Sequence, residues 1–334
     1  MGLLRIRLLA LLAVAVALVA GAAAAPAAAE DAEDPRIPTE LAIRTLDTAP
    51  VFGELRPVVA ELITVPKTPH GGLVQFSIDG VPAGEPAPLR TVPNVVSWVA
   101  TLVVPTDLAA GDHVIEATFP GDDAYAPSTA SVEYRVDPAS TTTTLSAAPA
   151  SVSVGDDVTL SAQVAVEAPG AGTPTGTMQF HVDGSPLGAP VALDGDRVTL
   201  TTDTLPAGDH TITATYAGDG NFHPSTSSGT TVSVAKRATT LLAQPALVRL
   251  SPLGLPLGRL QATLTRGTAP VPGAEVDFTA GSRSLCTATT DASGVATCAA
   301  TLRLVDLLLS FGYTASYAGS DTDLAATARG GLLG

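Results

Sequence analysis

The segment PAGDHTITATYAGDGNFHPSTS at residues 206–227 decides the fold, because it nearly repeats the segment AAGDHVIEATFPGDDAYAPSTA at residues 109–130. The glycine and aromatic positions of the two segments are separated by the same distance in sequence: Gly111 and Gly208, like Tyr125 and Phe222, are 97 residues apart. A repeat at a fixed period of about 100 residues indicates consecutive copies of one small domain.

Further blocks extend this repeat in both directions. VQFSIDG at residues 74–80 returns as MQFHVDG at residues 178–184. A third, more diverged copy contains AEVDFTAGS at 274–282 and YTASYAGSD at 313–321. The sequence therefore predicts three successive domains.

Side chains within the repeated blocks alternate between apolar and polar. An alternation with a period of two is typical of antiparallel strands that bury one face. After residue 29 no stretch shows a sustained helical period, apart from a short leucine run at 305–309. The predicted fold class is therefore all-β. In one predicted strand the inward residues are Ile212, Ala214 and Tyr216, and the outward residues are Thr211, Thr213 and Thr215.

Two short segments connect the predicted domains. In RVDPASTTTTL at 135–145 and VSVAKRATTLL at 232–242, one last strand runs almost directly into the next first strand. Brief connections favour a rod of stacked domains over a flexible string. We expect domains at residues 40–137, 138–235 and 236–334.

Residues 1–29 have the three parts of a secretory signal peptide. Arg5 and Arg7 precede an apolar run, and the small residues GAAAAPAAAE follow it. We expect cleavage after Ala29, which leaves an acidic linker at 30–39; the alternative is an uncleaved membrane anchor, because the apolar stretch is 22 residues long. No second hydrophobic span follows, so no membrane span is expected after cleavage.

The charge balance is strongly acidic. The formal net charge is −15, and removal of Arg5 and Arg7 with the signal peptide makes it −17. A surface of this sign repels the phosphate backbone, so we expect no nucleic-acid partner.

The turn and strand pattern resembles the bacterial immunoglobulin-like repeats found in tandem on exported proteins. The pattern TGTMQFHVDG followed by LPAGDHTITATYAGDGNFHPSTS carries this resemblance, and residues 40–235 match it twice as repeats of the group 3 type. The third segment, PVPGAEVDFTAGSRSLCTATTDASGVATCAATL, looks more like an invasin-type immunoglobulin-like module. The resemblance implies tandem β-sandwiches, location outside the cell and a role in adhesion or spacing, and it transfers no catalytic residue.

The two cysteines, Cys286 and Cys298, flank the turn DASG at 291–294. In a hairpin they would lie opposite or nearly opposite each other, so we expect a disulfide in an exported protein. The alternative is a two-thiol metal or redox site, although no CxxC motif or nearby histidine supports it.

The carboxylates clustered in the acidic turns are candidate calcium ligands, namely those of Asp122, Asp123 and Asp219. We favour a structural role for these residues, because the turns need Gly and Asp and no DxDxDG loop is present. Tyr125 and Phe222 would then fold back to plug the end of the core. No cofactor and no bound metal is expected.

Recognisable catalytic patterns are absent from the sequence: it has no GxSxG, no HExxH and no cysteine paired with histidine. We therefore expect a non-catalytic protein that is secreted or at the cell surface and whose partner is an extracellular protein or glycan. The alternatives are a glycan-binding module, in which Trp98 would stack on sugar, and an enzyme of unfamiliar type. A core position for Trp98 is the simpler interpretation.

If the signal peptide is cleaved as expected, the exported protein begins at Glu30. Intact-mass spectrometry of protein recovered from the culture medium or cell surface measures this directly. Recovery of the chain with Met1 still attached would instead support the membrane anchor.

Overall fold

The structure is a computed structural model that describes residues 34–46, 48–64, 71–91, 97–250, 256–301 and 311–333. The expected signal peptide at 1–29, the first part of the linker at 30–39 and the leucine run at 305–309 lie outside these ranges.

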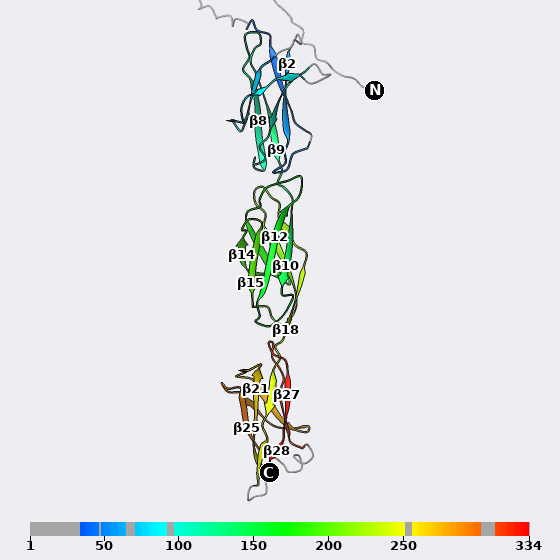
Figure 1. Ribbon diagram of the computed structural model, residues 1–334, viewed down its shortest axis with the longest axis vertical. Helices are drawn as coiled ribbons and strands as arrows, with labels where there is room; N and C mark the ends of the chain where they lie inside the picture. The colour runs from blue at the N-terminus through cyan, green and yellow to red at the C-terminus, as the bar shows by residue number, and fades with distance from the viewer. Residues whose placement is uncertain are drawn as a thin grey trace, which may run out of the picture.

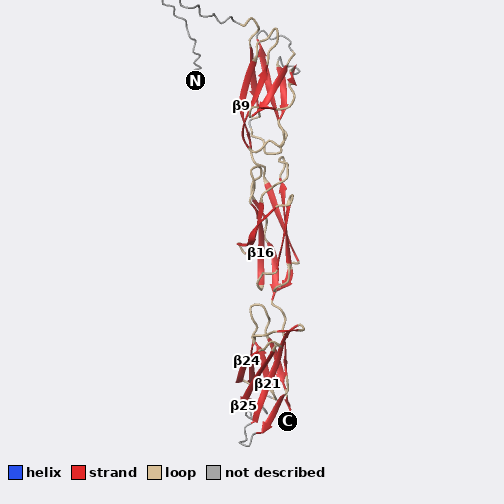
Figure 2. Cartoon of the chain, turned by 90° about the vertical axis from the view of Figure 1, so that its left-hand side faces the viewer, coloured by secondary structure: helices blue, strands red, loops and turns tan. Residues whose placement is uncertain are grey.

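The described residues form strands and turns, without a helix, and the strands build three successive β-sandwiches (Figure 1; Figure 2). Both views show the sandwiches end to end along the long axis. Each sandwich has its own cluster of buried apolar residues. The predicted all-β class of tandem immunoglobulin-like sandwiches is confirmed.

A search of the described residues for helices long and apolar enough to cross a membrane finds none.

The first sandwich consists of two antiparallel sheets. One has the strand order β1-β2-β7-β6, and the other has the order β4-β3-β8-β9 with β5 also paired to β3. The strands are β1 (Thr39–Arg44), β2 (Pro57–Thr64), β3 (Leu73–Ile78), β4 (Val81–Pro82), β5 (Ala87–Pro88), β6 (Arg90–Thr91), β7 (Trp98–Val103), β8 (Gly111–Phe119) and β9 (Ser128–Val136).

The second sandwich repeats this plan. Its sheets have the orders β10-β12-β15 and β11-β18-β16-β13-β14, with β17 paired to β16, and β11 runs parallel to β18. The strands are β10 (Thr141–Ala148), β11 (Ser151–Ser153), β12 (Val158–Val166), β13 (Thr177–Val182), β14 (Ser185–Ala192), β15 (Arg197–Thr202), β16 (Gly208–Tyr216), β17 (Ser225–Thr226) and β18 (Thr230–Ala235).

The third sandwich has the sheet orders β19-β21-β20-β28, with β22 and β25 paired to β21, and β24-β23-β26-β27. Its strands are β19 (Thr240–Ala243), β20 (Ala246–Leu250), β21 (Pro256–Arg266), β22 (Ala269–Pro270), β23 (Glu275–Ala280), β24 (Arg283–Thr289), β25 (Val295–Thr301), β26 (Tyr313–Tyr317), β27 (Ala326–Gly330) and β28 (Leu332–Leu333).

The alternation in the sequence corresponds to alternate burial on the strands. On β16 the inward residues are fully buried, while the threonines between them face outward or are half-buried. Because side chains of a strand point to opposite faces in turn, one face fills the space between the sheets. The matching inward sets are Ile115, Ala117 and Phe119; Ile212, Ala214 and Tyr216; and Tyr313, Ala315 and Tyr317.

The expected disulfide between Cys286 and Cys298 is present, with Cα atoms 6.5 Å apart, but the hairpin placement was wrong. Cys286 on β24 pairs with Phe278 of one sheet, whereas Cys298 on β25 pairs with Leu260 of the other. The DASG turn is an arch that carries the chain between sheets. Gly294 is required there, because its φ is +76° and a Cβ would lie on the carbonyl oxygen of Leu264.

Neighbouring residues on β8 provide a matched test of the core. Ile115 is 0% exposed and Val114 is 48% exposed. Ile115→Ala should lower the free energy of unfolding of the first sandwich by about 2–5 kcal/mol, because it leaves a cavity, while Val114→Ala should change it by less than about 0.5 kcal/mol. Fluorescence of Trp98, the only tryptophan, reports urea unfolding of this sandwich. Equal effects of the two substitutions would contradict the assigned faces.

Candidate functional site at the joints between sandwiches

The first joint, between the first and second sandwiches, is built around Phe52. Its N–H donates to the carbonyl oxygen of Asp137 at 2.8 Å, which fixes the loop after β1 against the end of the first sandwich. The Phe52 ring meets the Phe222 ring edge-on, with centroids 5.3 Å apart, and packs against the second core. Aromatic pairs favour this geometry. The first sandwich therefore places an aromatic side chain on the end of the second core.

A glycine-containing loop of the second sandwich receives Phe52. The N–H of Ala171 donates to the Phe52 carbonyl oxygen at 3.2 Å. Gly172 has a φ of +123°, and a Cβ there would lie 3.0 Å from the Phe52 ring. At Gly170 a Cβ would lie 2.6 Å from the Cβ of Ala139. The close approach of the two sandwiches therefore depends on glycine in this loop.

Phe222 reaches the joint from a turn that Asp219 holds. Asp219 Oδ1 accepts the N–H groups of Asn221 and Phe222 at 2.8 and 2.9 Å, and Oδ2 accepts that of Thr175 at 2.9 Å. Burial raises the pKa of Asp219, but a hydrogen bond from the Thr175 hydroxyl, together with these backbone hydrogen bonds, outweighs burial and the pKa is lowered. Asn221 Oδ1 in turn accepts the N–H of Ala110 at 2.8 Å, a further bond across the joint.

The acidic turns considered for calcium use their carboxylates to form the turns. Asp122 Oδ1 accepts the N–H groups of Ala124 and Tyr125 at 2.8 and 2.9 Å, as Asp219 does in the next sandwich, and Asp123 is exposed. The structure does not bring Asp122 and Asp123 together with Asp219, since they belong to different sandwiches. Within the described part of the chain, no three His, Cys, Asp or Glu residues are grouped so that they could hold a metal ion.

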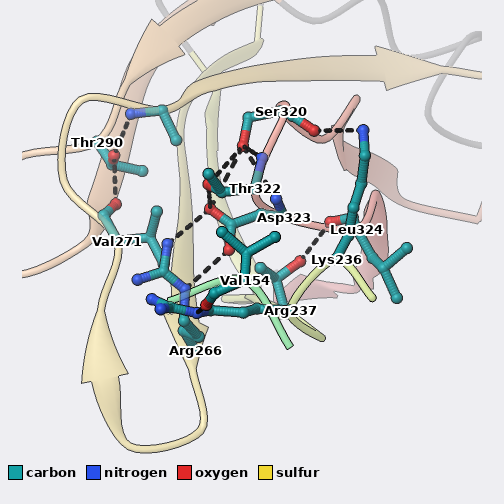
Figure 3. Close-up of polar contacts among 12 residues, drawn as sticks. Val154, Lys236, Arg237, Arg266, Val271, Thr290, Ser320, Thr322, Asp323 and Leu324 are labelled. Atoms are coloured by element: carbon teal, nitrogen blue, oxygen red, sulfur yellow. Dashed lines mark hydrogen bonds and ion pairs between the residues drawn. The ribbon is translucent and has the colours of Figure 1, made fainter. Parts of the chain in front are cut away.

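The second joint, between the second and third sandwiches, depends on cations. Arg237 Nε donates to the carbonyl oxygen of Val154, and its guanidinium fills the space beside Gly155, where a Cβ would overlap it (Figure 3). Lys236 Nζ donates to the carbonyl oxygen of Ser320 at 2.6 Å. Charged side chains thus connect the second sandwich to the third, whereas an aromatic ring connects the first sandwich to the second.

Asp323 occupies in the third sandwich the position of Tyr125 and Phe222 in the first two. Each of the three forms an isolated parallel bridge with the segment that enters its sandwich. Asp323 is buried, and Arg266 donates to it through Nε at 2.8 Å and Nη2 at 2.6 Å (Figure 3). The hydrogen bond from Arg266 holds the pKa of Asp323 below its usual value, against the opposing effect of burial. An ion pair between a buried carboxylate and a half-buried guanidinium thus stands where the first two sandwiches have an aromatic ring.

The remaining residues singled out from the sequence pack on the cores. Trp98 is half-buried on β7 and packs against the first core. Cys286 and Cys298 pack against the third core. The structure therefore does not bring these residues together into one site.

Sequence reasoning missed the residues of the joints and the ion pair. The offset of 101 residues that relates Tyr216 to Tyr317 also relates Phe222 to Asp323. This offset could have shown that the third copy has an aspartate in place of the aromatic residue. Phe52 lies outside the repeated blocks, and nothing in its sequence context marks it.

Residues 145–235 match the family described as Bacterial Ig-like domain (group 3). This range runs from within β10 to the end of β18 and therefore covers the second sandwich. The chain is a tandem immunoglobulin-like β-sandwich protein whose second sandwich matches this bacterial family. Among curated proteins, no sequence matches the chain.

Several solved multidomain structures resemble the chain at low similarity. The fragment I67–I69 from titin is 14% identical, covers 88% of this chain and 97% of its own, and has a TM-score of 0.31. The Escherichia coli adhesin FdeC is 19% identical over 90% and 98%, with a TM-score of 0.26. The Yersinia pseudotuberculosis adhesin InvE is 17% identical over 66% and 67%, with a TM-score of 0.31. Likeness at these scores carries no functional argument.

Removal of the buried carboxylate should destabilise the third sandwich. Asp323→Ala leaves the half-buried Arg266 guanidinium without its partner, and the expected cost is about 1–3 kcal/mol, because water still reaches the guanidinium. Asp321→Ala, an exposed aspartate of the same turn, should cost less than about 0.5 kcal/mol. Hydrogen-exchange protection of the β26 amides measures both.

The pair Asp323→Phe and Arg266→Leu, introduced together, should recover stability lost in Asp323→Ala by restoring an apolar plug. If Asp323→Ala is no more destabilising than Asp321→Ala, the ion pair does not hold this end of the sandwich.

Proposed function

We propose that the chain is an exported, non-catalytic structural protein, a stiff spacer or adhesion arm whose modules are residues 40–137, 138–235 and 236–334. The observation that carries this proposal is that both joints are bonded directly. The aromatic contact of Phe52 with Phe222 supports stiffness at the first joint, and the bond of Arg237 to Val154 supports it at the second.

Stiffness follows from how little free chain separates the modules. Between β9 and β10 the linker residue Ala139 donates to the carbonyl oxygen of Asn221 at 2.8 Å and accepts the N–H of His223 at 2.9 Å. Both backbone polar groups of this linker residue are thus hydrogen-bonded to the second sandwich. Relative motion of two modules requires breaking such contacts, whereas a free linker would allow it without cost.

The proposed location is outside the cell, secreted or at the surface. The signal-like segment at 1–29 supports export, and the disulfide between Cys286 and Cys298 suits an oxidising compartment. The proposed partner is an extracellular or cell-surface protein or glycan, and the acidic surface disfavours nucleic acid. No cofactor is required for such a role.

Small-angle X-ray scattering of the exported chain tests the rod. We expect a pair-distance distribution with the long tail of an extended particle. Phe52→Ala should shorten the tail by letting the first joint bend, and Leu55→Ala, an exposed leucine of the same loop, should leave it unchanged. A compact profile, or equal profiles for the two variants, would contradict the proposal.

Retention of the chain on peptidoglycan or polysaccharide separates a spacer from a glycan-binding module. The spacer should not be retained. Retention that Trp98→Ala abolishes would establish the glycan-binding alternative instead.

A further inference from the structure

His113 on β8 lies between two hydrogen-bond acceptors. Its Nδ1 is 2.7 Å from Oδ2 of Asp79, and its Nε2 is 2.8 Å from the carbonyl oxygen of Ala109. A carbonyl oxygen and an ionised carboxylate can only accept, so both ring nitrogens must carry hydrogen to satisfy both contacts. This geometry selects the positively charged imidazolium.

The acceptor Asp79 is itself fixed. It sits in the turn between β3 and β4 at a φ of 51°, and its Oδ1 accepts the N–H of Val114 at 2.8 Å. The hydrogen bond from His113 is the largest of the effects that hold the pKa of Asp79 below its usual value, so the carboxylate is ionised at neutral pH. The imidazolium therefore ties the Asp79 turn to the turn that contains Ala109.

That second turn is part of the first joint. The carbonyl of Ala109 and the N–H of Ala110 belong to one planar peptide group. His113 donates to the oxygen of this peptide group, while the N–H of the same group, that of Ala110, donates to Asn221 Oδ1 of the second sandwich at 2.8 Å. One rigid group is thus held by the imidazolium on one side and by the next sandwich on the other, and each bond polarises the other.

We propose that His113 makes the joint between the first and second sandwiches sensitive to pH: loss of a ring proton releases the 109–110 peptide and loosens the joint. A neutral ring keeps a single N–H and can donate to only one of its two acceptors. The proposal goes beyond the spacer role and would stand for any function of the chain.

The charged surroundings set the direction of the effect. Burial lowers the pKa of His113, but the hydrogen bonds to Asp79 and Ala109 and the nearby carboxylates outweigh burial, and the pKa is raised above 6.5. The stabilisation is then fully present below pH 6.5 and is lost as the pH rises through the raised pKa. The joint is stiff in acid and loosens in alkali.

Groups of both signs surround His113 on the elements packed against it. Asp79 lies on the facing turn and Asp112 on its own strand, where Arg135 pairs with it at 3.2 Å. Across the sheet the register partner Tyr134 lies between the charged residues of β9, and the Asn221 turn of the second sandwich contains Asp219. The carboxylates that act on His113 are those of Asp79 and Asp112, and the titratable group opposite it on β9 is Tyr134, beside which the charges of Glu54 and Arg56 lie.

The second sandwich contains a matched control. His210 makes the same two contacts, to Asp183 Oδ2 at 2.7 Å and to the carbonyl oxygen of Pro206 at 2.9 Å. The amide that follows is that of Ala207, and among the described residues no hydrogen bond joins it to the third sandwich. His210 should therefore titrate without changing a joint.

Distances between spin labels on the first two sandwiches test the proposal in the full chain. Labels attached through Ser131→Cys and Thr159→Cys, both exposed, leave the native disulfide intact. From about pH 5 to about pH 9 the distance distribution should broaden, with a midpoint above pH 6.5. His113→Leu should be broad throughout, and His210→Leu should retain the response.

Asn221→Ala provides a second route if His113→Leu fails to fold. It removes the joint contact but leaves both bonds of His113, so the ring should still titrate by NMR while the pH response of the distances is lost. A width that does not change with pH, a response that survives in His113→Leu or Asn221→Ala, or one lost in His210→Leu would overturn the proposal.

Discussion

Burial of alternate side chains between two sheets is the constraint on which the structure depends. Phe76, Phe180 and Phe278 stand at matching positions of the three copies, and each is at most 2% exposed. Burying a side chain of this size contributes about 1.5–3 kcal/mol, and a shift of one residue in register would turn the whole inward face toward water. The spacing of these residues thus fixes register, sheet pairing and the period of the repeat together.

The ends of the sandwiches show that one backbone geometry accepts different chemistry. Tyr125 and Phe222 close the first two cores with aromatic rings, and Asp323 closes the third through its two hydrogen bonds with Arg266. The Asp323 carboxylate is buried and the Arg266 guanidinium is half-buried, so this pair carries a desolvation cost that an apolar ring lacks. The joints differ in the same way: the first joint is built on an aromatic ring, and the second on the guanidinium of Arg237.

The repeated blocks allowed the fold class and the inward faces to be predicted, because period-two alternation is a local signal. The disulfide partners were also predictable, although the predicted hairpin between Cys286 and Cys298 was wrong. A short turn connects strands of one sheet or arches between two sheets, and that choice depends on distant partners such as Leu260. The joints escaped prediction for the same reason. Phe52 acquires its role only when the second sandwich presents Phe222 and a glycine loop to it.

The central claim is that copied sandwiches are held in line by bonded joints. Residual dipolar couplings of the amides on β8, β16 and β26, measured in one weakly aligned sample at acid pH, test it most directly. The account predicts that a single alignment tensor fits all three strands, since the sandwiches would tumble as one body. Separate tensors of different magnitude for the three sandwiches would contradict it.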